Sequence, residues 1–153
     1  YRRAYSITEL MAQTEELIAE GKMTKEAAEC SYFKSILAFA KSPVGMRMRN
    51  AFLNETLKRE QPFVMSVPAS EADPSYPEDE TILVQGIIDA WFPEGDEIVL
   101  VDYKTDRVKE VGELKKRYEK QLAYYQQALE RTTGKKVKEK IIYSLALDEE
   151  LVL

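Results

Sequence analysis

Two apolar stretches joined by a short turn-forming sequence constrain the fold of this chain most strongly. They run from Thr81 to Phe92 and from Glu97 to Tyr103, and they are separated by Pro93-Glu94-Gly95-Asp96. Apolar runs of this length around proline, glycine and acidic residues are typical of two antiparallel strands and their turn. The sequence therefore predicts a β-hairpin at the centre of the fold.

The register of this hairpin decides which side chains meet. A loop centred between its third and fourth residues places Pro93 opposite Ile98 and, further along, Asp89 opposite Asp102. Directly opposed residues of an antiparallel pair have Cβ atoms about 4.5–5.5 Å apart on one face. Lys104, two residues beyond Asp102, points to that same face. A slip of one residue would move Asp89 to the other face, so the predicted site depends on this register.

Two opposed carboxylates would destabilise a strand pair that had only a structural role. A divalent cation held by Asp89 and Asp102 would remove the repulsion, and the backbone carbonyl of Tyr103 would add a ligand. Lys104 would then orient or activate a water molecule and offset the charge that develops on a phosphate. The opposing interpretation is a surface hairpin in which Asp102 and Lys104 form an ion pair without function.

A helix is predicted after the hairpin, because apolar residues recur every three or four positions between Asp106 and Gly134. Gln121 and Tyr125 share one face of it, since four residues separate them. A glutamine within an apolar stripe is unfavourable unless it has a partner. Either Gln121 bonds a buried backbone group while Tyr125 packs in the core, or both residues place a substrate. Three further tyrosines are interpreted as packing residues: Tyr118, Tyr124 and Tyr143.

The first third of the chain has helical periodicity. Ser6-Ile7-Thr8-Glu9 fits a capping box, and a second apolar stripe follows Thr24. Ser42-Pro43 can cap and start a third helix that extends to Leu57. At Arg59 the period of apolar residues changes to two, which indicates a strand.

The remaining segments complete a mixed α/β order of elements. The acidic, proline-containing stretch from Ala69 to Glu80 is predicted to be a solvated loop, and Val137 to Leu145 a final strand. The order of helices, three strands, a helix and a strand predicts an α/β fold in which helices pack against a central mixed sheet.

The composition excludes several kinds of chemistry. The 153 residues include no histidine and one cysteine, Cys30, which is expected to be a small core residue. These counts exclude Ser-His and Cys-His catalysis, an internal disulfide and most catalytic zinc sites. The available oxygen ligands favour magnesium or manganese.

Charge and hydropathy narrow the possible partners less than the motifs do. A net charge of −5 does not indicate nucleic-acid binding, and the local basic clusters at residues 115–117 and 135–140 are typical of solvated surface. No apolar run approaches the roughly 18 residues that cross a membrane, and no signal peptide is visible. The start at Tyr1 and the absence of histidine suggest a fragment of a larger protein.

Three ordered motifs resemble those of RecB-family nucleases within the PD-(D/E)XK superfamily. They are Gly86-Ile87-Ile88-Asp89, Val101-Asp102-Tyr103-Lys104-Thr105-Asp106 and Gln121-Leu122-Ala123-Tyr124-Tyr125. The middle motif, extended by Arg107-Val108, is most similar to the AddA family of helicase–nuclease subunits. So is Arg59-Glu60-Gln61-Pro62-Phe63, which enters the first predicted strand. The resemblance covers most of the chain.

The resemblance implies a restriction-endonuclease-like nuclease core over residues 59–153, preceded by a helical N-terminal segment over residues 1–58. It implies a deoxyribonuclease, an exonuclease, that hydrolyses DNA with magnesium and for which manganese can substitute. The whole enzyme would be a helicase–nuclease that processes double-strand breaks for recombinational repair. Its implied partners are single DNA strands fed by the helicase motor and a protein of the AddB type, in the bacterial cytoplasm and without a membrane.

By the same resemblance, Asp89 and Asp102 are metal ligands, Lys104 is the catalytic lysine, and Gln121 and Tyr125 line the site near the DNA. The family has a metal-binding histidine on an upstream helix, which this chain lacks. The isolated chain is therefore expected to bind metal weakly and to cleave DNA poorly. Two other interpretations are a non-catalytic DNA-binding or scaffolding module of this fold and a stand-alone resolvase or restriction-like enzyme.

Overall fold

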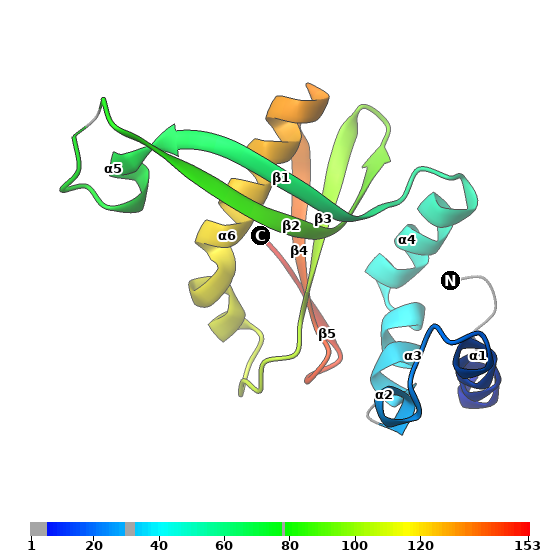
Figure 1. Cartoon of the computed structure of the whole chain (residues 1–153). Coiled ribbons are helices and arrows are strands. Elements are labelled where there is room, and N and C mark those ends of the chain that lie inside the picture. The colour runs from blue at the N-terminus through cyan, green and yellow to red at the C-terminus, as the bar shows by residue number, and fades with distance from the viewer. Residues whose placement is uncertain (1–5, 30–32, 78) are drawn as a thin grey trace.

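The computed structural model describes residues 6–29, 33–77 and 79–153, which form a five-stranded sheet with helices on both faces (Figure 1). The strands lie in the order β1-β2-β3-β4-β5, and β3 and β4 pair in parallel while the other neighbours are antiparallel. Their bounds are β1 Lys58–Pro68, β2 Thr81–Glu94, β3 Glu97–Lys104, β4 Val137–Ser144 and β5 Glu149–Val152. The predicted α/β fold with a central mixed sheet is confirmed.

The helices fall into two groups along the chain. Four of them precede the sheet and two lie between strands: α1 Ile7–Ala19, α2 Lys25–Glu29, α3 Phe33–Lys41, α4 Pro43–Leu53, α5 Ala69–Ala72 and α6 Gly112–Thr133. The predicted caps are present, because Ser6 Oγ accepts a hydrogen bond from the Glu9 N–H and Ser42 Oγ accepts one from the Gly45 N–H. None of the helices in the described ranges is long and apolar enough to cross a membrane.

Two predicted boundaries are wrong. Helix α4 ends at Leu53 and does not include Leu57, because Glu55 adopts a left-handed φ of 59° that turns the chain out of the helix. The stretch predicted as a loop after Pro68 begins with the short helix α5, whose first residue, Ala69, is almost fully buried. The small apolar side chain of Ala69 anchors this turn at the end of β1.

One strand was not predicted. After β4, Asp148 takes a φ of 55°, and the chain reverses so that Leu151 of β5 lies opposite Ile142 of β4. The four residues of β5 are too few for a clear alternation of apolar and polar side chains, which explains the omission. The expectation for Cys30 lies outside the described residues.

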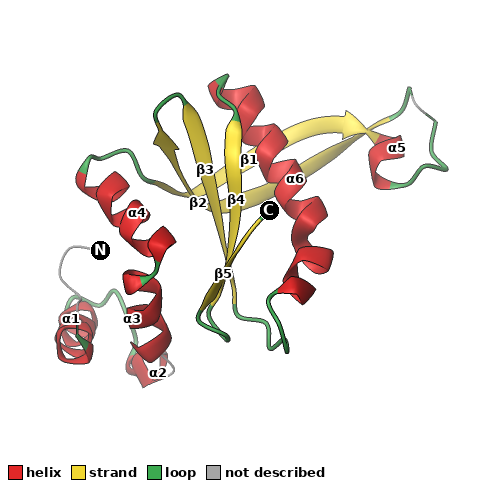
Figure 2. Ribbon diagram, turned by 180° about the vertical axis from the view of Figure 1, so that it is seen from behind, coloured by secondary structure: helices red, strands yellow, loops and turns green. Residues whose placement is uncertain are grey.

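Helices cover both faces of β3, the central strand. Val99 and Val101 pack with buried residues of α4, whereas Ile98 and Leu100 pack with buried residues of α6. Figure 2 shows α6 along one face of the sheet and α4 on the other side. A strand that is buried on both faces is apolar throughout, so a carboxylate near its end is exceptional.

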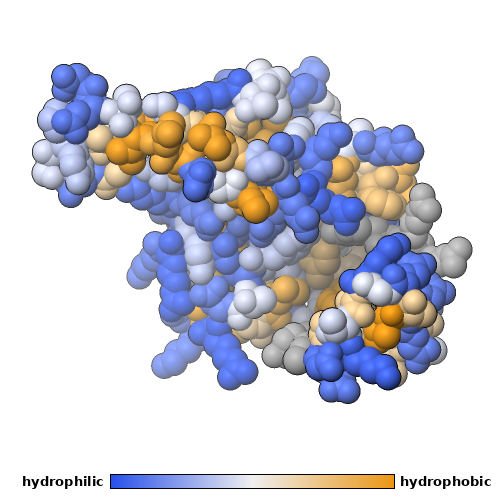
Figure 3. Space-filling view, in the orientation of Figure 1, coloured by the Kyte–Doolittle hydropathy of each residue, from blue (hydrophilic) through white to orange (hydrophobic). Residues whose placement is uncertain are grey.

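β1 and β2 continue past the rest of the sheet as a two-stranded arm that ends at α5 (Figure 1). Apolar side chains are exposed along it (Figure 3), among them Val64 and Leu83. Near its base, Gly86 lies opposite Phe63, and a Cβ atom on Gly86 would come within 2.9 Å of the Phe63 ring. Glycine therefore lets Phe63 reach Tyr125 of α6, where the two rings meet edge to face at 5.5 Å.

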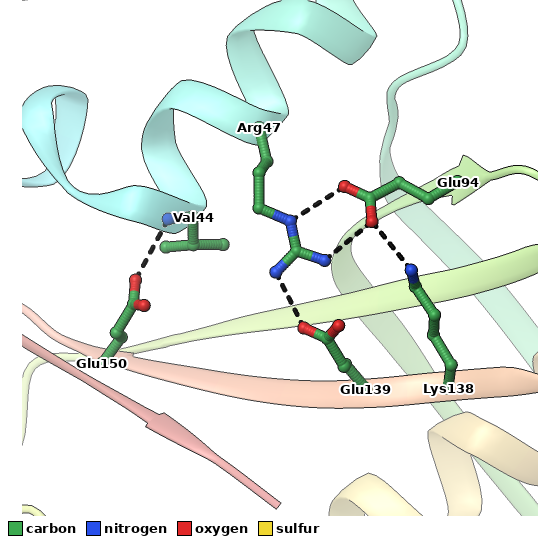
Figure 4. Close-up of polar contacts among 6 residues, drawn as sticks. All are labelled: Val44, Arg47, Glu94, Lys138, Glu139 and Glu150. Carbon is green, nitrogen blue, oxygen red and sulfur yellow. Dashed lines mark hydrogen bonds and ion pairs between the residues drawn. The ribbon is translucent and has the colours of Figure 1, made fainter.

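Arg47 of α4 joins the helical segment to the turn of the β2–β3 hairpin (Figure 4). Its guanidinium donates hydrogen bonds to both carboxylate oxygens of Glu94, at 2.8 and 2.9 Å, and to Glu139 of β4 at 2.7 Å. Lys138 Nζ lies 2.9 Å from the same Glu94 carboxylate. A guanidinium that spans two carboxylates fixes orientation as well as distance, so this cluster sets how α4 lies on the sheet.

The N-terminus of α4 has a second attachment to the sheet. Glu150 of β5 accepts a hydrogen bond from the Val44 N–H at 3.1 Å (Figure 4). The first N–H groups of a helix have no partner within the helix, and a carboxylate there is electrostatically favourable. The strand that was not predicted from the sequence therefore holds the helical segment in place.

Candidate active site

The predicted register of the β2–β3 hairpin is present. Pro93 lies opposite Ile98, and Ala90 lies opposite Val101. The next position along this register brings Asp89 and Asp102 opposite each other, just beyond the end of the backbone ladder. There the Asp89 carboxylate accepts a hydrogen bond from the backbone N–H of Tyr103 at 2.9 Å, so the side chain is fixed against β3.

The sheet is irregular at Asp89. Ile88 belongs to the core cluster beside α6 and Ala90 to the cluster beside α4, although residues two apart in a regular strand share a face. Across from Asp89, Glu60 of β1 has a φ of 51°, in the left-handed region, and interrupts the β1–β2 pairing. Such irregularities change the direction of side chains and are common beside active sites.

Asp102 is only 1% exposed, and its Oδ2 atom lies 2.7 Å from Nζ of Lys104. The angle of this contact is not that of a hydrogen bond, so Oδ2 accepts none from the described residues. Burial raises the pKa of the Asp102 carboxyl, the ion pair with Lys104 lowers it less, and the nearby Asp89 charge raises it further. The site therefore contains a buried carboxylate that one lysine does not fully compensate.

Helix α6 contributes the next two predicted residues. Gln121 Oε1 accepts a hydrogen bond from Lys104 Nζ at 3.1 Å, and Gln121 Nε2 donates one to the Tyr125 hydroxyl at 2.8 Å. Gln121 thus bonds side chains on both sides, and not the backbone group that one interpretation expected. Burial raises the pKa of Tyr125, and the charges of Asp102 and Asp89 raise it further, so this hydroxyl stays protonated.

The structure therefore brings the predicted side chains together. Asp102, Lys104, Gln121 and Tyr125 form one continuous chain of contacts, and Asp89 joins it through the backbone of Tyr103. Their catalytic roles, and the metal-ligand role of the Tyr103 carbonyl, stay predictions at this point.

A cavity of about 440 Å³ opens beside Asp89. Its wall includes Arg59 and Glu60 of β1 together with Phe39 of α3. The sequence did not place Glu60 in the site, although its position in the Arg59–Phe63 motif was a signal. The left-handed φ of Glu60 could not be read from the sequence, and it is this backbone conformation that places the residue across from Asp89.

The donor set fits a partly hydrated magnesium ion better than a metal held entirely by protein. Within residues 6–29, 33–77 and 79–153, no group of three or more His, Cys, Asp or Glu side chains is placed to hold a metal. Asp89 and Asp102 supply two carboxylates, and magnesium is commonly held by one or two carboxylates with water in the other positions. The incompletely paired Oδ2 of Asp102 is the atom that most needs a further cation.

Comparison with known proteins adds an independent observation. Residues 3–151 match the family model described as the PD-(D/E)XK nuclease superfamily. The chain is 39% identical over 151 residues to the AddA-type ATP-dependent helicase/nuclease subunit of Clostridium botulinum (strain Loch Maree / Type A3). It is 37% identical over 147 residues to the protein of the same name from Clostridium kluyveri (strain NBRC 12016). These alignments cover 96% and 94% of this chain but only 12% of each relative.

Proposed function

The chain belongs to the PD-(D/E)XK nuclease superfamily, and from this membership we propose that it is the magnesium-dependent nuclease domain of a longer helicase–nuclease. Its reaction is the hydrolysis of phosphodiester bonds in DNA. The observation that carries the proposal is the buried Asp102–Lys104 pair, set beside Asp89 at the end of the hairpin. A structural ion pair would have no need of a second carboxylate facing it.

Each residue has a defined task in this proposal. Asp89 and Asp102 would hold the divalent ion, which supplies an activated water molecule and a Lewis acid when it is bound. Lys104 donates hydrogen bonds to the attacked phosphate or to the water molecule, and its 13% exposure strengthens that interaction because little solvent screens it. Gln121 accepts one N–H of Lys104 and so directs the others toward the substrate.

The relatives support a role within a larger machine. Their shared name describes one subunit of an ATP-dependent helicase/nuclease, and this chain spans 12% of their length. We propose that a motor in the same polypeptide feeds single DNA strands to this domain, together with a partner protein of the AddB type, during repair of double-strand breaks. The net charge of −5 fits this arrangement, since the remainder of the enzyme would supply the basic DNA-binding surface.

Anomalous diffraction from crystals soaked in MnCl₂ tests the metal site directly. The proposal expects a manganese peak between Asp89 and Asp102, close to the Tyr103 carbonyl. Asp102→Asn should remove the peak, whereas Asp96→Asn at the exposed turn of the same hairpin should keep it. A wild-type peak elsewhere, with these carboxylates free, would contradict the assignment.

Cleavage by the full-length protein tests the reaction. Asp102→Ala and Lys104→Ala should abolish cleavage of DNA and spare ATP-dependent unwinding, while Asp96→Ala should leave both unchanged. DNA binding without metal-dependent cleavage in the wild-type protein would instead support a non-catalytic module of the same fold.

A further inference from the structure

The motif that carries Lys104 continues to Asp106, and the helix that carries Gln121 begins earlier with Tyr118. Neither Asp106 nor Tyr118 has a task in the proposed reaction. Tyr118 lies three residues before Gln121, so both side chains project from the same face of α6 toward Lys104. The sequence indicated a packing role for Tyr118, and part of its ring does pack against the α6 core cluster.

The Tyr118 ring also contacts the lysine. Nζ of Lys104 lies over the ring at 4.1 Å from its centroid, well within the distance at which a cation is attracted to an aromatic face. The same ammonium lies 2.7 Å from Asp102 and 3.1 Å from Gln121. Three groups from two elements therefore define its position, and the aromatic face closes a side that no hydrogen bond holds.

Asp106 fixes the ring in turn. The Tyr118 hydroxyl lies 2.9 Å from each carboxylate oxygen of Asp106, and Arg117 Nη1 lies 3.3 Å from Oδ1. Burial raises the pKa of Tyr118 and the hydrogen bond to Asp106 raises it further, so the hydroxyl remains a donor. A tyrosine that is fixed at its far end loses the freedom to swing away from Lys104.

We propose that Asp106 and Tyr118 form a positioning pair that holds the Lys104 ammonium in place for the nuclease reaction. The inference rests on the proposed function. Asp106 anchors the tyrosine hydroxyl, and the ring presents its negative face to the lysine. Because the anchor lies on the loop after β3 and the ring lies on α6, the pair also fixes the separation of the two elements that carry Lys104 and Gln121.

A nuclear magnetic resonance measurement on the metal-free 153-residue chain tests the contact without any activity. Protons above an aromatic face are shifted upfield, so the ε-methylene protons of Lys104 should resonate upfield of those of the other lysines. Lys104→Arg identifies the signal by its disappearance. Tyr118→Leu should return it to the ordinary position, and Tyr124→Leu on the same helix should leave it shifted. A Lys104 signal at the ordinary position in the wild-type chain would overturn the proposal.

Kinetics of the full-length protein test the consequence. Tyr118→Leu should lower kcat about tenfold and leave KM for DNA unchanged, because the lysine acts mainly in the transition state. Tyr118→Trp should restore most of kcat, since it supplies an aromatic face without the original hydroxyl. Tyr118→Phe keeps the packing and loses only the anchor, so a smaller fall in kcat is expected even if Tyr118→Leu unfolds.

The anchor itself is tested by combining variants. Tyr118→Phe and Asp106→Asn weaken the same hydrogen bond, so the double variant should be no slower than the slower single variant. Additive losses, or a change confined to KM, would overturn the proposal. If the wild-type protein does not cleave DNA, the proposed function fails, and the Lys104 resonance then decides separately whether the pair positions this lysine.

Discussion

The two ends of the β2–β3 hairpin both carry carboxylates, but their surroundings differ. At the turn, Glu94 accepts hydrogen bonds from Arg47 and faces Lys138, and these contacts lower its pKa to about 2, with Arg47 the larger cause. At the far end, Asp102 is nearly fully buried with one cation, Lys104, and burial raises its pKa. One carboxylate is stabilised as an anion by the fold and the other is destabilised.

The difference separates attachment from chemistry. At the turn, two cations meet two carboxylates, Glu94 and Glu139, so the cluster is neutral and its only visible role is to hold α4 on the sheet. At the far end, Asp89 and Asp102 share one lysine. A buried and incompletely compensated carboxylate lowers stability, so its presence is best explained by a ligand that binds there. Matched variants at the two ends should therefore differ in cleavage, stability, metal response and acid response, in decreasing order of effect.

The largest effect should be on cleavage. In the full-length protein, Asp102→Asn should reduce the rate of metal-dependent DNA cleavage by about 100-fold or more, because both charge and ligand are lost. Arg47→Met should leave the rate unchanged at temperatures where the protein is folded. Initial rates on a single-stranded oligonucleotide with MgCl₂ measure both. Comparable losses in the two variants would show that the ends of the hairpin are not functionally distinct.

Sequence alone predicted the elements whose signal is local. The hairpin register followed from its turn residues, and that register was enough to bring Asp89, Asp102 and Lys104 together. The partner of Gln121 was left open between two interpretations because a stripe of residues defines a helical face but not the opposing surface. The structure supplies that partner, Lys104.

The features that were not predicted depend on distant parts of the chain or on single dihedral angles. Arg47 and Glu139 are 92 residues apart, and no spacing rule connects them. The left-handed backbone of Glu60 occurs inside a strand whose composition gives no sign of it. The contact between Tyr118 and Lys104 requires the path of the loop after β3, which periodicity does not determine.

The second prediction concerns stability. Arg47→Met should lower the free energy of unfolding by about 2 kcal/mol, because it leaves Glu94 and Glu139 partly buried with only Lys138 between them. The figure is reduced from that of a fully buried pair because the Arg47 side chain is 29% exposed. Urea titration of the chain measures it. Lys22→Met, in an exposed pair with Glu20, should be unchanged, and an equal loss there would contradict the explanation.

The third prediction uses metal as a ligand of the folded state. Manganese at ten times its dissociation constant should raise the free energy of unfolding by about 1.4 kcal/mol. Arg47→Met should show the same increment from a lower baseline, and Asp102→Asn should show none. Thermal unfolding with and without MnCl₂ measures the increments. A full increment in Asp102→Asn would place the metal away from the hairpin end.

The smallest effect is the response to acid, where the two ends should have opposite signs. The pKa of Glu94 is about 2 against an ordinary 4.5, so its stabilisation is present above pH 4.5 and is lost as pH falls toward 2. The stability difference between wild type and Arg47→Met should therefore shrink by about 1 kcal/mol between pH 6 and pH 3, allowing for solvent screening of a side chain that is 33% exposed. Urea titrations at the two pH values measure this change.

Asp102 should respond in the other direction in the metal-free chain. Its pKa is raised, so the stability that it contributes is present below its ordinary pKa of 3.8 and is lost as pH rises through the raised value. Relative to wild type, Asp102→Asn should therefore become more stable on going from pH 3 to pH 6, while Arg47→Met becomes less stable. If both variants shifted in the same direction, the fold would treat the two carboxylates alike, and the separation of attachment from chemistry would fail.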